Sequence, residues 1–157
     1  MPKSNQEQKN IEHIWTVLCT ASSVDSQSNN ITLFNVLEQL NISRKNDAPP
    51  LDVKNGEPLP FQMELISLWR KLGINEKVAG VVKNVLINPL GQEVGSQIMP
   101  LEIKSPNRRM RTRVQINGVQ ITGPGYYTWQ VRLVDGKSEH IVANVPFEIF
   151  ISNDSKK

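Results

Sequence analysis

Polar and largely apolar residues alternate strictly between residues 109 and 117, where every second position is Arg or Gln until the segment ends at Asn117. A period of two is the side-chain period of a β-strand, so the alternate residues point to opposite faces of a sheet. The inward face is expected to hold Met110, Thr112, Val114 and Ile116. We therefore predict a half-buried strand over this segment.

The same period returns in residues 127–134. It places four side chains inward, namely Tyr127, Trp129, Val131 and Leu133. The dipeptide Asp135-Gly136 follows directly, and Asp-Gly between two apolar alternations is a strong hairpin signal. We expect the partner strand at residues 139–151, so that the C-terminal third is antiparallel sheet.

The first half of the chain is ambiguous in its periodicity. Residues 33–42 and 62–72 fit a helical stripe and a strand about equally well. We favour strands, because the remainder of the chain reads as sheet and residues 77–88 are rich in β-branched side chains. A helix somewhere in residues 33–76 is the alternative.

Turn signals divide the chain into short apolar runs. Residues 46–60 contain four prolines and an Asn-Gly pair, which neither a helix nor a central strand accommodates, and this predicts a long loop near residues 44–60. The 157 residues suffice for one core. We predict one domain over residues 11–151, with disordered polar tails at residues 1–10 and 152–157.

Composition narrows the protein class. Hydrophobic residues make up 38% and charged residues 21%, with a net charge of +3, which excludes collagen-like and membrane-spanning chains and indicates only a mildly basic protein. Cys19 is the single cysteine, so no intrachain disulfide can form. The polar N-terminus lacks the apolar stretch of a signal peptide. We expect a cytoplasmic protein without a membrane partner.

The segment Gly125-Tyr-Tyr-Thr-Trp129 has the pattern Gly-x-Tyr-x-Trp, which is similar to the tyrosine-corner strand of immunoglobulin-like sandwiches. The order of motifs along residues 12–150 also resembles a family of small, uncharacterised, mainly bacterial β-sandwich proteins. The residues that carry this resemblance are Trp15 to Cys19, Val24-Asp25, Asn29 to Glu38, Ser67-Leu-Trp69, Asn88-Pro-Leu-Gly91, Arg111 to Gly118, Gly125-Tyr-Tyr127 and Val145-Pro146.

The resemblance implies an immunoglobulin-like or C2-like fold and supplies no catalytic motif. With the strand predictions above, it leads us to expect an all-β, antiparallel β-sandwich of about seven to nine strands.

Nucleophilic chemistry would have to use Cys19 with His13 or His140. On one regular strand His13 and Cys19 would face the same side but lie about 20 Å apart, too far for proton transfer. We interpret Cys19 as a small buried core residue. No enzyme motif occurs, so we expect no catalytic residues and no cofactor.

Calcium would need clustered carboxylates, as in C2-like sandwiches. The aspartates instead stand singly in separate loops and are more simply turn residues that accept a backbone N–H; they are Asp25, Asp47, Asp52 and Asp135. We expect no metal site.

Arginines are concentrated on one predicted strand. Three of them would project from one face at intervals of roughly 7 Å, a spacing that suits successive phosphates of an extended nucleic-acid strand. If neighbouring strands added Lys104 and Arg132 to the same face, the patch could bind nucleic acid or another anionic surface. The candidate anion-binding residues are Lys104, Arg108, Arg109, Arg111, Arg113 and Arg132.

The alternative interpretation of the arginines is a solvated outer face that protects a sheet edge. The shortage of exposed aromatic side chains for base stacking favours this alternative, because Tyr127 and Trp129 are predicted inward and Tyr126 alone outward. We expect Trp15 and Trp69 to be core residues. The proline-rich loop either packs over the end of the sandwich or offers an edge to a partner.

These observations predict a cytoplasmic, non-enzymatic interaction module that binds a protein partner or a second copy of itself. The alternative is nucleic-acid or anionic-surface binding through the arginine-rich strand, residues 108–113.

Overall fold

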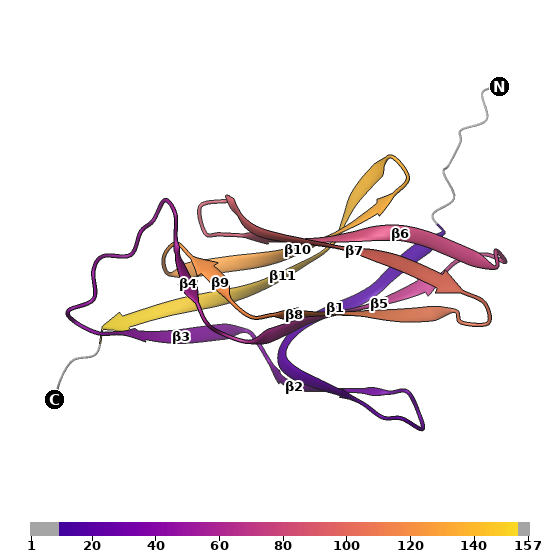
Figure 1. The fold of residues 1–157 in the computed structure, drawn as a ribbon, viewed down its shortest axis with the longest axis horizontal. Helices are drawn as coiled ribbons and strands as arrows, with labels where there is room; N and C mark the ends of the chain where they lie inside the picture. Colours follow the sequence, from indigo (N-terminus) through magenta and orange to yellow (C-terminus); the bar gives the residue numbers. More distant parts are fainter. Residues whose placement is uncertain (1–9, 154–157) are drawn as a thin grey trace.

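The computed structural model describes residues 10–153, which form two β-sheets packed face to face and no helix (Figure 1). The first sheet has the strand order β2 (Ile31–Val36), β1 (Ile11–Val24), β5 (Met63–Lys71) and β8 (Arg109–Ile116). The second has the order β3 (Gln39–Arg44), β11 (Ser138–Asn153), β10 (Gly125–Asp135), β6 (Lys77–Ile87) and β7 (Glu93–Lys104). Two short strands, β4 (Glu57–Leu59) and β9 (Val119–Ile121), pair separately.

The all-β prediction is confirmed, but the strand count and the pairing differ from it. Residues 10–153 contain eleven strands, and β3 runs parallel to β11. The extra strands arise because residues 31–44 switch sheets at Leu37 and Glu38, so that β2 joins the first sheet and β3 the second. Residues 33–76 hold strands and loops, so the helix considered there is not present.

The predicted long loop is found between β3 and β4, and β4 closes its C-terminal end. Its apolar side chains Leu51 and Leu59 are partly buried against the core, together with Phe61, whereas Val53 is exposed. Of the predicted tails, residues 1–9 and 154–157 lie outside the described residues, and Ser152 and Asn153 continue β11. No helix in the described part of the chain could cross a membrane.

The core lies between the two sheets and uses the inward positions that the alternation predicted. Each large apolar side chain buried there contributes about 1.5–3 kcal/mol through removal from water. The fully buried members include Leu65 and Trp69 of β5, Val82 of β6, and Tyr127 and Val131 of β10. Trp129 and Leu133 are also buried, whereas Tyr126 is exposed as predicted.

Tyr127 ties the loop that precedes β10 to the core. Its buried hydroxyl accepts the backbone N–H of Thr122 at 2.9 Å and of Gly123 at 3.2 Å, and donates to the carbonyl of Gly123 at 2.8 Å. The chain reaches this position through Gly125, whose φ of +125° strains any residue with a Cβ atom and whose close approach to Pro89 would leave that atom little space. The Gly-x-Tyr pattern thus fixes how β10 begins.

We expect Tyr127→Phe to lower the free energy of unfolding by about 1–2 kcal/mol, because the buried N–H of Thr122 and the partly buried N–H of Gly123 lose their acceptor. Urea unfolding at neutral pH measures this. The matched control is Tyr126→Phe, which removes the neighbouring exposed hydroxyl and should change stability by less than about 0.5 kcal/mol. Equal losses in the two variants would show that the Tyr127 hydroxyl does not hold the loop.

Candidate functional site

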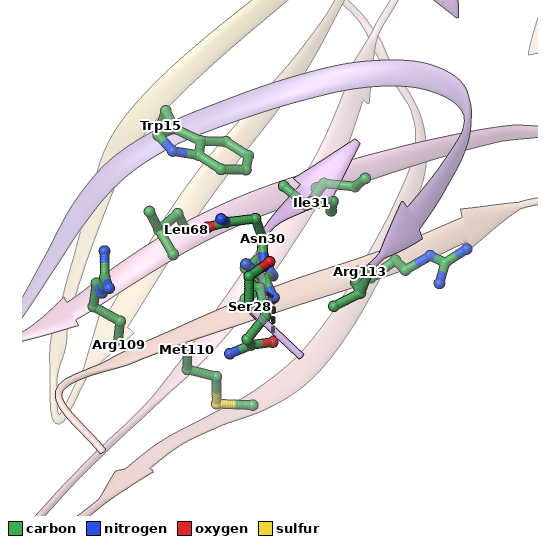
Figure 2. Close-up of a pocket in the computed structure, with 12 residues that line it drawn as sticks. Trp15, Ser28, Asn30, Ile31, Leu68, Arg109, Met110 and Arg113 are labelled. Atoms are coloured by element: carbon green, nitrogen blue, oxygen red, sulfur yellow. Dashed lines mark hydrogen bonds between the residues drawn. The ribbon is translucent and has the colours of Figure 1, made fainter. Parts of the chain in front are cut away.

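The β1–β2 hairpin folds back over the outer face of the first sheet. A bulge between His13 and Trp15 interrupts the pairing of β1 with β5, and a bulge strengthens the bend and twist of a strand. Although β2 and β8 are at opposite edges of the sheet, the hairpin turn reaches β8, where Asn29 contacts Arg111. The ribbon of β1 arches over this region (Figure 2).

The hairpin turn is ordered by its own side chains. One carboxylate oxygen of Asp25 accepts the backbone N–H of Gln27 at 2.7 Å and of Ser28 at 2.9 Å. These bonds lower the pKa of Asp25, the bond from Ser28 most strongly. Asn29 then adopts a left-handed φ of +56°, which asparagine tolerates better than most residues. Asp25 is therefore a turn residue, as predicted, and Asp52 caps its turn in the same way.

A groove of about 680 Å³ lies between the hairpin turn and the sheet (Figure 2). Three neighbouring strands supply one cross-strand row of outward side chains, Trp15, Leu68 and Arg111. Arg109 extends the groove along β8. The turn covers it with Ser28, Asn29, Asn30 and Ile31.

Trp15 is only half-buried, and its indole lines the groove (Figure 2). The prediction that Trp15 is a core residue is therefore wrong, whereas the same prediction for Trp69 is confirmed. The difference follows from the register, because Trp15 is opposite the outward Leu68 and His13 is opposite the inward Trp69. The groove thus contains an accessible aromatic face that sequence analysis missed.

Arg111 holds the hairpin turn over the groove. Its Nη2 donates to the backbone carbonyl of Asn29 at 2.8 Å and to the side-chain Oδ1 of Asn29 at 2.7 Å. Both acceptors are neutral, so the positive charge is not compensated. A guanidinium has five N–H donors, and no bond from the Nε or Nη1 of Arg111 is found within residues 10–153. Arg111 is therefore fixed in place and retains donors for an anion.

Arg109 is exposed, and its side chain has no hydrogen bond or ion pair within the described residues. Its cross-strand neighbour Arg70 is different, because the carboxylate of Glu12 binds it. Arg108 is also exposed and precedes β8. The uncompensated positive charge of the groove is thus concentrated at Arg109 and Arg111, and Arg108 does not line the groove.

Arg113 is neutralised by a buried carboxylate. Its Nε and Nη2 donate to the two oxygens of Glu64 at 3.1 and 2.7 Å, and the hydroxyl of Ser22 adds a bond of 2.6 Å. The bonds from Arg113 hold the pKa of Glu64 below its ordinary value, against the opposing effect of burial. Figure 2 shows Arg113 extending away from the other side chains of the groove. Arg113 therefore links strands, and Glu64 compensates its charge although its half-exposed side chain lines one end of the groove.

Lys104 and Arg132 do not join the arginines of β8. Both lie on the outer face of the second sheet, where Lys104 pairs with Glu102 at 2.8 Å and Arg132 with Glu139 at 3.0 Å. The condition of one continuous six-residue patch is not met, because the chain crosses to the other sheet between β7 and β8. Arg109 and Arg111 form a smaller group, and Trp15 and the hairpin turn line the same groove.

The residues considered for nucleophilic chemistry are separated. The bulge places His13 and Cys19 on opposite faces of the sheet, so the expectation that they share a face is wrong. His13 packs edge-on against Trp69 and bonds Thr16, while burial and the charge of Glu64 raise the pKa of the Cys19 thiol. His140 is exposed on the second sheet. Nor do three His, Cys, Asp or Glu side chains gather into a metal site in the described residues.

Comparisons with known proteins give little to set beside this geometry. No family model and no curated protein matches the chain. Among solved structures, it is similar to Pseudomonas fluorescens alkylpurine DNA glycosylase AlkC bound to DNA containing an abasic site analog, with 10% sequence identity and a TM-score of 0.49. The match covers 90% of this chain but only 30% of that one.

The predicted protein-interaction module is not what this comparison returned: the matched structure is a protein bound to DNA. The alternative prediction, nucleic-acid binding, agrees with it better. A TM-score below 0.5 carries no structural argument, so the case for binding has to come from the residues of the groove themselves.

We expect Glu64→Gln to lower the free energy of unfolding at neutral pH by about 1–2 kcal/mol, because the ion pair with Arg113 is lost. The loss stays this small because the half-exposed Arg113 can turn to solvent. Because the pKa of Glu64 is lower in the folded state than in the unfolded state, the carboxylate stabilises the folded protein at pH values above the ordinary pKa of glutamate, about 4.3. This stabilisation is lost as the pH falls through the lowered pKa. Urea unfolding across the acidic range should therefore show the two proteins converging. The matched control is Glu139→Gln, which breaks an exposed pair; a loss as large there, or a gap that persists in acid, would refute this role of Glu64.

Proposed function

We propose that this protein binds single-stranded nucleic acid in the groove between the β1–β2 hairpin turn and the first sheet. The observation that carries the proposal is that an accessible indole and two arginines without a carboxylate partner line the same groove. Aromatic faces that stack on bases, combined with positive charge along the backbone, are the means by which proteins hold single strands.

The two arginines suit a run of phosphates. Arg109 and Arg111 alternate along β8 and face the same side, so they lie roughly 7 Å apart. Arg111 is held by Asn29 in advance of binding, which reduces the entropy lost when it orders around a phosphate. Phosphates bound along β8 would leave a base free to point across Leu68 toward Trp15.

A single strand fits this groove better than a duplex. The hairpin turn covers the groove, and the bases of a duplex are stacked inside the helix where the Trp15 indole does not reach. An unpaired nucleotide presents its base face freely. We therefore propose binding to unpaired nucleotides, without a chemical step.

The class of the sandwich and the cellular location of the protein are two further proposals. We propose an immunoglobulin-like class for the sandwich, as the motif resemblance implies; the three bonds of the Tyr127 hydroxyl to upstream backbone support it, because a tyrosine corner makes such bonds. A cytoplasmic location is supported by Cys19, a buried free thiol and the one cysteine of the sequence.

Arg109→Ala tests the proposal without disturbing the fold, since that side chain has no bond within the described residues. We expect the affinity for a fluorescein-labelled oligonucleotide of about twelve thymidines to fall about three- to tenfold at low salt. Two phosphate contacts predict a slope of log K against log salt near −1.4, falling to about −0.7 in the variant. Fluorescence anisotropy measures both quantities.

The matched control is Arg132→Ala, which removes the same charge from the second sheet and should leave affinity within about twofold. Equal losses of affinity in Arg109→Ala and Arg132→Ala would show that binding depends on net charge and not on the groove. An oligonucleotide that fails to bind the wild type would end the proposal.

Replacing Trp15 tests the stacking surface. Stacking contributes about 1–3 kcal/mol per base, so Trp15→Leu should weaken oligonucleotide binding at least about fivefold, and Trp15→Phe should recover most of the loss. Urea unfolding of both variants separates binding from folding. Binding by folded Trp15→Leu at wild-type affinity would contradict a stacked base.

A further inference from the structure

Asn30 places an amide inside the groove. It belongs to the hairpin turn that covers the site, and in Figure 2 its side chain extends in the direction of Leu68 and Trp15. Its backbone is engaged, since the carbonyl accepts from the N–H of Asp25 and the N–H donates to Ser28. No hydrogen bond of its side chain is found within residues 10–153, so the amide keeps both a donor and an acceptor for a ligand.

The adjacent Asn29 has a different task. Its side-chain oxygen accepts from Arg111, and its left-handed backbone shapes the turn. The bonds of Asp25 to residues 27 and 28 hold the turn that presents both asparagines. Asn30 is therefore presented by an ordered loop while its own side chain is not part of that order.

Resting on the function proposed above, we propose that Asn30 reads the edge of the base that stacks on Trp15, and that the site prefers adenine. An asparagine amide pairs with a base edge that offers one donor beside one acceptor. In adenine the N6 amino group lies between N1 and N7, so either edge of the base fits.

The other bases offer fewer edges of this kind. Cytosine and thymine offer one such edge and a smaller face to the indole. Guanine offers two acceptors, O6 and N7, on its outer edge, which leaves the Asn30 carbonyl unmatched there, so guanine matches the amide on its Watson–Crick edge alone, through N1–H and O6. A groove of about 680 Å³ has room for a purine nucleotide with its 5′-phosphate at Arg109.

Titration with nucleoside monophosphates tests the inference, because they carry one base and one phosphate and do not stack on themselves along a strand. The indole N–H signal of Trp15 in ¹⁵N-labelled protein reports the dissociation constants of AMP, GMP, CMP and UMP. We expect AMP to bind about fivefold more tightly than CMP and UMP, which offer a smaller face to the indole, and at least about twofold more tightly than GMP. In Asn30→Ala, AMP should weaken to the level of GMP.

The matched control is Gln27→Ala, which removes an exposed amide of the same turn that is not part of the groove and should leave the ranking unchanged. An unchanged preference in Asn30→Ala, an equal ranking in the wild type, or no binding of any nucleotide would each overturn the role of Asn30. Oligonucleotide binding that still depends on Arg109 would show that the proposed function survives that outcome. Absence of both nucleotide binding and Arg109-dependent oligonucleotide binding would contradict the role of Asn30 and the proposed function alike.

Discussion

The buried carboxylate of Glu64 is the constraint on which the outer face of the first sheet depends. A charge that is 4% exposed is costly unless it is paired, and it is paired through Arg113 of β8 and Ser22 of β1. Satisfying Glu64 draws the end of β1 across β5 toward β8. The β1–β2 hairpin therefore covers this face instead of extending the sheet into solvent, and the groove is the space left beneath its turn.

The same arrangement assigns different roles to arginines that look alike in the sequence. Arg113 is paired with Glu64, and Arg111 is held by neutral acceptors of Asn29. Arg109 is left free in the described residues. A face built in this way combines a rigid frame with uncompensated charge, which is the combination that anion binding requires because the donors are ordered before the ligand arrives.

Alternation along the chain was sufficient to predict the strands and their inward faces. The period of two in β8 and β10 depends only on local pleating, and the core positions Val114, Tyr127 and Val131 follow from it. Which faces meet in space depends on non-local pairing. The bulge before Trp15, the chain crossing after Lys104 and the carboxylate partner of Arg113 leave no local pattern. The accessible indole is therefore not predictable from the sequence, nor is the face on which Lys104 and Arg132 lie.

Backbone amide mapping by NMR tests the central claim, that the groove under the hairpin turn is where nucleic acid binds, most directly. Adding an oligothymidylate to ¹⁵N-labelled protein should shift the indole N–H of Trp15 and the amides of residues 28–31 and 109–111. Amides around Lys104 and Arg132 should stay in place. Shifts concentrated on that outer face of the second sheet, or no shifts at a saturating concentration, would contradict the account.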